Sequence, residues 1–265
     1  MFSMYHMLWL LIAAALVVLV RTVLLRRQVP LRTVLTMACV VAVLSEVVKV
    51  FNTIDLVPSQ DGSMLFPYLK PQELPLHLCS MQILLIFYAR FAKEGPRRTA
   101  VLAFMYPTCF LGGIAALAIP SIYSANMVAP SQSFTQPLAY QFFLYHTMLV
   151  ALGLYIVASR QVALRPRHYW STMGLLGTLA FVSLYLNSMF AGANYENGAL
   201  VSVDYTPNFM FTYQPPIPIQ LTTLGQWYVY LAVMCLIACV LIGLCYVPVW
   251  LRDKRKNEHE KTDRR

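Results

Sequence analysis

The chain has little charge and no long polar segment. Only 12% of its 265 residues are charged, whereas an ordinary soluble domain has about 25%. Apolar residues make up 58% of the chain, and the mean hydropathy is +0.59. A separate soluble domain is excluded, because the apolar runs and their connections take up almost the whole chain. We therefore expect an all-α polytopic membrane protein.

Four further observations narrow the function classes. None of the six cysteines lies in a long loop, so no extracellular disulfide framework is expected. No convincing internal repeat is present, which disfavours an inverted-repeat transporter. The last apolar run, from Trp227 to Leu251, has no lysine for a retinal Schiff base. The net charge of +9 comes from scattered residues, and nucleic-acid binding needs them on one soluble face, so no nucleic-acid partner is expected.

Seven apolar runs approach the length of about 20 residues that crosses a bilayer. The predicted spans are 7–25, 31–51, 76–92, 99–122, 139–159, 169–190 and 227–251. They form one transmembrane domain over 1–251, followed by a charged cytoplasmic tail at 252–265. The loop at 191–226 is long and rich in aromatic residues. It predicts either a lid folded back over the outer mouth of the bundle or an interfacial aromatic belt.

Basic residues gather on alternate sides of the predicted spans. The tail and the loops after the first, third and fifth spans hold 18 of the 20 lysines and arginines, and such an excess is typical of cytoplasmic loops. The other loops hold five acids and one base, Lys70. We therefore expect the N-terminus outside, the C-terminus in the cytoplasm, and a multi-pass location in the cell (cytoplasmic) membrane.

Polar side chains from several predicted spans fall at one depth. At 1.5 Å rise per residue they lie within roughly 5 to 12 Å of the outer hydrocarbon edge. They are Glu46, Lys49, His77, Cys79, Gln82, His146, Ser183 and Asn187. Polar groups inside a span normally face the bundle interior. This layer is therefore the candidate site.

Spacing suggests how some of these groups pair. Glu46 and Lys49 are three residues apart on one helix face, so they are expected to neutralise each other, since a pair costs less than either charge alone. His77 and Cys79 lie about 200° apart around a regular helix, which argues against a chelating pair unless the first turn is distorted. No metal and no cofactor is expected.

A cysteine and a histidine could meet in this layer. Cys79 and Gln82 share a helix face, and His146 lies at a similar depth on another span. A thiol beside an imidazole is the minimal equipment for acyl transfer through a thioester, and Asn187 or Asn194 could orient the imidazole or hold an oxyanion. The alternative is that the buried cysteine packs as a small hydrophobe and that the histidines bond backbone carbonyls.

Four short motifs resemble a known family. They are Leu-Pro-Leu-His77-Leu-Cys79, Tyr145-His146-Thr147, Gly192-Ala-Asn194-Tyr195 and Leu224-Gly-Gln-Trp227-Tyr228. Together they resemble the bacterial YwaF-type (treponemal-type conserved) integral membrane family, which is distantly similar to eukaryotic multi-span lipid acyltransferases and ester hydrolases. The resemblance implies Cys79 as nucleophile and His146 as base, with His77 beside them. The long insert between Asn194 and Trp227 departs from the family pattern.

The predicted function is a membrane-embedded enzyme that transfers or cleaves lipid acyl esters. Its catalytic residues would be Cys79, His146 and His77, and a membrane lipid would be its substrate. The residues expected to bind that lipid are Glu46, Lys49, Gln82, Asn187, Asn194 and Tyr195. The alternative is a carrier or receptor that binds a small polar or lipid ligand under the outer loop. The oligomeric state stays open.

Overall fold

The computed structural model describes residues 3–59, 61–196, 199–205, 207–216 and 219–262, and these are mostly helical. The long helices are α1 (Met4–Arg26), α2 (Leu31–Thr53), α4 (Pro96–Ala118), α6 (Pro137–Ala158), α7 (His168–Met189) and α8 (Leu224–Thr262). All six are long and apolar enough to cross a membrane. A seventh apolar helix, α3 (Leu78–Phe91), is shorter. The prediction of an all-α polytopic membrane protein is confirmed.

Helix α3 departs from the predicted third span. It has 14 residues, which is about 21 Å of helix against the roughly 30 Å of the hydrocarbon core. Pro71–Glu73 forms a short 3-10 turn, η1, and His77 is extended and precedes the first helical residue, Leu78. The first turn expected around Pro75 therefore does not form, and the 200° separation of His77 and Cys79 does not apply.

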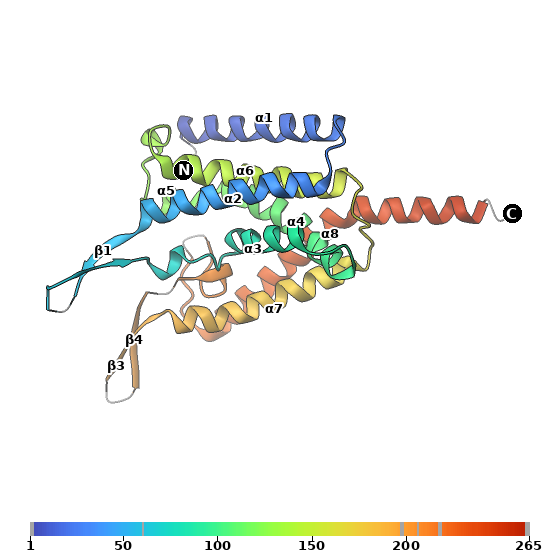
Figure 1. The fold of residues 1–265 in the computed structure, drawn as a ribbon. Coiled ribbons are helices and arrows are strands. Elements are labelled where there is room, and N and C mark those ends of the chain that lie inside the picture. The colour runs from blue at the N-terminus through green and yellow to red at the C-terminus, as the bar shows by residue number, and fades with distance from the viewer. Residues whose placement is uncertain (1–2, 60, 197–198, 206, 217–218, 263–265) are drawn as a thin grey trace.

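Short elements join the helices at the end of the bundle that holds the N-terminus (Figure 1). One hairpin pairs β1 (Asp55–Pro58) with β2 (Leu65–Tyr68), and another pairs β3 (Gly192–Glu196) with β4 (Ala199–Tyr205), both antiparallel. The rest are α5 (Ser121–Ser124), η2 (Pro130–Gln132) and η3 (Phe209–Phe211). Both hairpins project from the end that holds the N-terminus, and the C-terminal part of α8 leaves from the other end (Figure 1).

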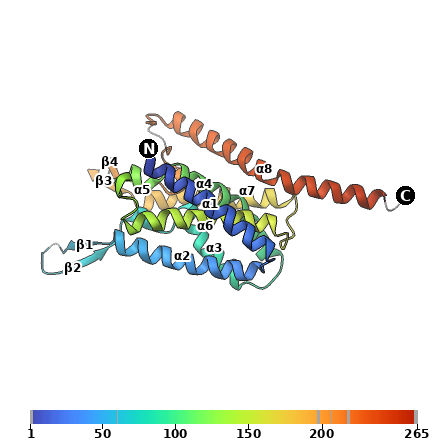
Figure 2. The same cartoon turned by 90° about the horizontal axis from the view of Figure 1, so that it is seen from above.

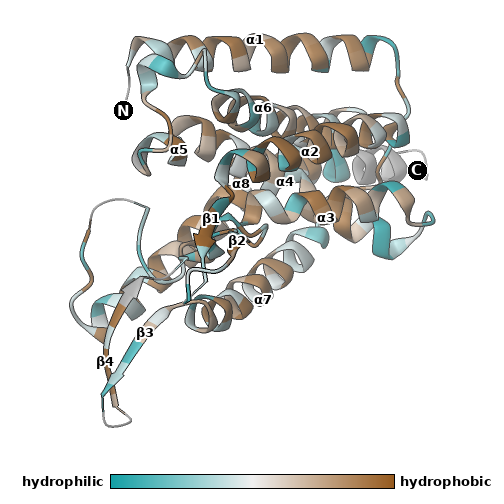
Figure 3. Ribbon diagram, turned by 60° about the vertical axis from the view of Figure 1, so that its left-hand side comes forward, coloured by the Kyte–Doolittle hydropathy of each residue, from teal (hydrophilic) through white to brown (hydrophobic). Residues whose placement is uncertain are grey.

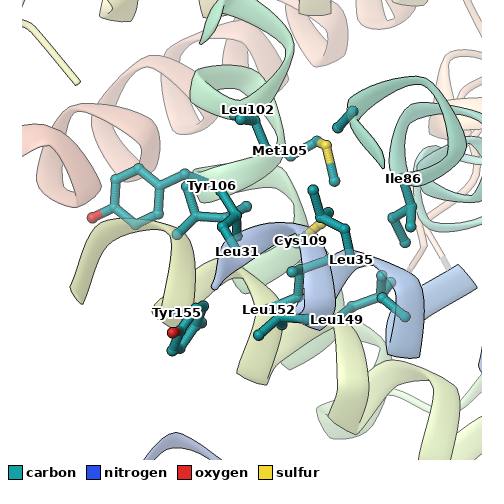
Figure 4. Packing of buried hydrophobic residues seen from close by; sticks show 14 of the residues in the cluster. Leu31, Leu35, Ile86, Leu102, Met105, Tyr106, Cys109, Leu149, Leu152 and Tyr155 are labelled. Carbon is teal, nitrogen blue, oxygen red and sulfur yellow. The ribbon is translucent and has the colours of Figure 1, made fainter. Parts of the chain in front are cut away.

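The main core lies where α2, α3, α4 and α6 meet. Figure 4 shows side chains of these helices packed together, among them Leu35, Ile86, Cys109 and Leu149, all fully buried. Glycines bring α4 and α6 close: a Cβ on Gly113 would lie 2.9 Å from the carbonyl oxygen of His146. Small residues allow such close approach of membrane helices. The core thus fixes the spacing of the helices that carry the candidate site.

The outer faces of the helices are apolar. Figure 3 shows hydrophobic residues along most of α1 and α2, and large exposed side chains on α1 include Leu11, Val18 and Leu19. Exposed apolar surface of this extent marks contact with another apolar phase, which for helices of this length is the lipid. The solvent of this fold is the bilayer.

The predicted charged tail is largely helical. Helix α8 continues through Thr262 and extends past the bundle in Figure 2, because the residues after Leu251 are mostly good helix formers such as Arg, Lys and Glu and contain no Gly or Pro. Residues 263–265 of the predicted tail lie outside the described residues.

Candidate functional site

Cys79 is the second residue of α3, and its side chain faces α4. Its Sγ lies 3.7 Å from the carbonyl oxygen of Gly112, and a Cβ on Gly112 would come within 3.4 Å of that sulfur. The absence of a side chain at Gly112 therefore leaves space beside the thiol. Cys79 is half-buried.

The start of α3 leaves backbone donors near this thiol. Its cap residue, His77, makes no side-chain capping bond, and no acid stands in the first turn. The first bond across the cap runs from the N–H of Met81 to the carbonyl of His77, so the N–H groups of the first turn lack a side-chain acceptor. A helix N-terminus of this kind favours negative charge. It suits both a thiolate and an oxyanion formed next to it.

Tyr145 connects this helix start to α6. Its hydroxyl donates to the carbonyl oxygen of Cys79 at 2.8 Å, and its side chain is buried. The sequence marked Tyr145 only as the neighbour of His146, and its bond to α3 was not predicted. A tyrosine inside an apolar run was the available signal, since a buried phenol needs a partner.

His146 is buried and held by its own helix. Its Nδ1 lies 2.7 Å from the carbonyl oxygen of Phe142, and its ring packs on the Phe142 ring with centroids 4.3 Å apart. A carbonyl only accepts, so Nδ1 carries the proton in the neutral ring and Nε2 keeps its lone pair. That tautomer has a basic nitrogen. Among the described residues, no hydrogen bond joins His146 to Cys79.

Gln82 links α3 to α4 one turn further along. Its amide nitrogen donates to the hydroxyl of Thr108 at 3.0 Å, and its amide oxygen lies 3.1 Å from the Sγ of Cys109. The side chain is fully buried. These bonds hold α3 against α4 and so fix the height of Cys79, while the predicted contact of Gln82 with a substrate stays a prediction.

Glu46 and Lys49 form the predicted ion pair. The Lys49 ammonium lies 2.7 Å from the Glu46 carboxylate, which confirms the pairing, and it also donates to the backbone carbonyl of Glu73 at 2.8 Å. Its charge acts on the ring of His77 as well. The pair therefore stands where η1 leads into α3, on the approach to Cys79.

Glu73 provides a pH test of this packing. Burial raises the pKa of its carboxyl, and repulsion by Glu46 adds to this, while Lys49 opposes it. An acid with a raised pKa in the folded protein loses stability as the pH rises from its unfolded to its folded pKa. Glu73→Gln should therefore raise the Tm at pH 7.5 and leave it nearly unchanged at pH 4, as thermal scans in detergent would measure. An equal shift at both pH values would contradict this.

The long loop at 191–226 returns to the bundle as a plug, which we define as residues 208–214. The ring of Phe209, fully buried, meets the ring of His77 edge-on at 5.2 Å between centroids. Phe211 lies 6.3 Å from the same ring. The lid predicted from the aromatic composition is therefore present over the start of α3.

Asn187 on α7 holds the plug. Its amide oxygen accepts the N–H of Phe209 at 2.6 Å, and its amide nitrogen donates to the Phe209 carbonyl at 3.1 Å and to the Thr212 hydroxyl at 2.9 Å. Ser183, one turn away, lies 3.1 Å from that hydroxyl. Asn187 was predicted to bind substrate or orient the imidazole. In the structure its amide oxygen and nitrogen hydrogen-bond to the plug instead.

Asn194 and Tyr195 are placed apart from the polar layer. Both belong to β3, whose hairpin projects away from the helices (Figure 1). Tyr195 is 66% exposed, and the Asn194 amide donates to Ser202 across the hairpin. The long insert that follows them draws these residues into strand pairing. The structure thus joins Glu46 and Lys49 to η1 and Cys79 and Gln82 to α4, and it joins α6 to α3 through Tyr145.

No group of three or more His, Cys, Asp or Glu side chains that could hold a metal ion occurs within the described part of the chain. The site is therefore described by its thiol, its imidazoles and its ion pair alone.

Comparison with known proteins corrects the resemblance drawn from the motifs. The family model that matches the chain is that of the TMEM164 family, over residues 1–246. This match replaces the YwaF-type assignment, which no comparison supports. The four motifs are short, and three of them lie at or beside span ends, where aromatic residues and Pro are common in membrane proteins generally. No curated protein and no solved structure matches the chain. With its model covering nearly the whole sequence, the chain belongs to the TMEM164 family of membrane proteins.

Proposed function

We propose that this membrane protein is an enzyme that transfers or cleaves lipid acyl esters through Cys79, with His146 as general base. The observation that carries the proposal is the position of Cys79 as the second residue of an uncapped helix, bonded through its carbonyl to Tyr145, the neighbour of His146. The first-turn N–H groups of α3 would stabilise the thiolate once His146 has taken its proton. A histidine with Nδ1 bonded to a carbonyl presents Nε2 as a base.

The reaction would run in two steps. His146 Nε2 takes the thiol proton, the Cys79 sulfur bonds to the ester carbonyl carbon, and the carbon–oxygen ester bond breaks as the imidazolium returns the proton to the leaving alcohol. In the second step a hydroxyl of the acceptor, or water, loses its proton to His146 and attacks the thioester. The carbon–sulfur bond then breaks, and the sulfur regains a proton. First-turn N–H groups of α3 would stabilise both oxyanions.

The surrounding groups suit a lipid. Apolar helices surround the site, and Glu46 and Lys49 place a paired charge at its entrance, where a headgroup would lie. The basic loops at the opposite end of the bundle support an entrance at the outer leaflet. We propose the cell membrane as the location. His77 would contact the headgroup or ester, because it lies between Lys49 and Cys79.

Selective labelling tests the proposal. A fatty-acyl chloromethyl ketone should alkylate Cys79 faster than the other five cysteines, and His146→Ala should slow that labelling by about tenfold or more, since the thiol loses its base. Peptide mass spectrometry of the full-length protein in detergent measures each site. Equal inertness of all six cysteines would count against the enzyme.

A carrier or receptor is the second candidate. Two observations favour it: the plug covers His77, as a lid over a ligand would, and no hydrogen bond joins Cys79 and His146 among the described residues. Catalytic contacts are often loose without substrate, so the second observation does not decide between them. The two functions differ in what Cys79 must do.

A further inference from the structure

Three arginines from three helices converge at the end of the bundle opposite to Cys79. Arg32 stands in the first turn of α2, Arg90 in the last turn of α3 and Arg98 in the first turn of α4. The loops that join α1 to α2 and α3 to α4 lie at this end, from which α8 leaves the bundle (Figure 1). The charges of Arg32 and Arg90 both act on Arg98. We name these three residues the arginine cluster.

Arg98 is buried with part of its guanidinium unsatisfied. The residue is 9% exposed. Its Nε donates to the carbonyl oxygen of Ala89 at 2.7 Å, but its Nη2 is buried and has no acceptor among the described residues. A buried cationic N–H group without an acceptor is costly. This nitrogen indicates that a partner is missing at this end of the fold.

The cluster has no compensating acid bonded to it. Arg90 is fixed to α2, because its Nε donates to the hydroxyl of Thr36 at 2.5 Å. Glu94 opposes these charges at Arg98 and acts on it more strongly than Arg90 does, but it forms no ion pair with Arg98 among the described residues. The ion pairs within the described residues are Glu46 with Lys49 and Asp55 with Lys70, so none involves the cluster. Two of the three guanidinium groups, those of Arg90 and Arg98, are thus held by bonds to neutral groups.

The helix ends add to the positive potential. Helix α4 begins at Pro96 after Gly95, with no side-chain cap and no acid in its first turn. Helix α2 begins after Pro30 with no acid in its first turn, and only the N–H of Leu31 is taken up by a side chain, the amide oxygen of Gln161 at 2.7 Å. Helix N-termini carry partial positive charge and normally attract acids, yet both begin with arginine in the first turn. Such a combination of N-termini and guanidinium groups is suited to an anion.

We infer that the arginine cluster binds a phosphate group at the cytoplasmic face, either on the headgroup of an inner-leaflet lipid or on a soluble phosphorylated molecule. Guanidinium groups bind phosphate oxygens in bidentate fashion. Arg32 is exposed and Arg90 half-buried, so these two meet the phosphate from the solvent side, and the buried Nη2 of Arg98 is the donor left for an inner phosphate oxygen. Cys79 and Arg90 are separated by 11 residues of α3, about 16 Å, so this site is independent of the proposed function.

The experiment uses the full-length protein in nanodiscs and measures Tm. One arm compares phosphatidylcholine discs with discs that contain 10 mol% phosphatidic acid (on the order of a few lipids per disc). The other arm titrates inorganic phosphate, with sulfate as a second anion, into phosphatidylcholine discs. Variants are Arg32→Gln, Arg90→Gln and their double, and the matched control is Arg26→Gln, a cytoplasmic arginine outside the cluster.

The wild type and Arg26→Gln should gain Tm from phosphate, and the apparent Kd should rise by about tenfold in each cluster variant. The ligand-free variants should be as stable as the wild type, because repulsion within the cluster falls. A gain only with phosphatidic acid assigns the site to a lipid headgroup, and a gain with inorganic phosphate assigns it to a soluble phosphate. No gain in either arm, or an equal gain in the double variant, would overturn the inference.

Discussion

Replacing Cys79 with serine should lower the turnover of a lipid ester by about three orders of magnitude or more. Serine keeps the size and polarity of the side chain, but its hydroxyl ionises far less readily than a thiol, and the helix N-terminus cannot make up the difference. Release of a fluorescent acyl group from a lipid in nanodiscs measures the rate. The control is Cys235→Ser, at an exposed position on α8, which should keep full turnover.

Turnover, compared at unchanged lipid affinity, separates the enzyme from the binder in the same experiment. An enzyme with Cys79→Ser should bind the lipid as before and turn it over slowly, and His146→Ala should show the same pattern. A carrier or receptor should show no turnover in the wild type and unchanged affinity in both variants. Full turnover by Cys79→Ser would rule out the thioester route, because a serine at this position cannot form a thioester.

Asn187→Ala should lower the free energy of unfolding by about 2 to 4 kcal/mol. Its amide bonds both backbone groups of Phe209 and the hydroxyl of Thr212, and alanine would leave these buried groups without partners. The plug should then detach, and the Phe209 region should exchange its amide hydrogens faster. Thermal unfolding and hydrogen exchange in detergent measure the two effects.

The matched control for this prediction is Asn194→Ala. Asn194 is exposed on β3, and such surface changes usually alter stability by less than about 0.5 kcal/mol. If Asn187→Ala were as mild as this control, or if it left exchange of the plug unchanged, the plug would not depend on the amide bonds.

The helices could be predicted because the length and apolar composition that each needs to cross the bilayer are local properties of the sequence. Apolar length indicated all seven to within about four residues at every end but one, since a spanning helix pairs its backbone internally. The exception is the end of α8, which continues 11 residues past the predicted Leu251. At the start of α3, Pro71, Pro75 and the extended His77 delay the helix to Leu78. Turn chemistry and contacts with the plug decide that start. Hydropathy indicates neither the turn nor the contacts with the plug.

The site could be predicted only where its contacts are local. Glu46 and Lys49 lie three residues apart, so their pairing follows from helix geometry. The bonds of Asn187 to Phe209 and of Tyr145 to Cys79 join residues far apart in sequence, and no periodicity indicates them. Asn194 was misplaced for the same reason, because strand pairing in the insert decided its position.

The most direct measurement is capture of the acyl group on the protein. The full-length chain is mixed with a lipid ester without acceptor, quenched in acid, digested and examined by mass spectrometry. The proposal predicts an acyl thioester on the peptide that contains Cys79, and neutral hydroxylamine should remove it. The adduct should be absent from Cys79→Ser, and it should form more slowly in His146→Ala. The proposal would be contradicted if the wild type turned the lipid over without an adduct on Cys79 and Cys79→Ser turned it over at the same rate.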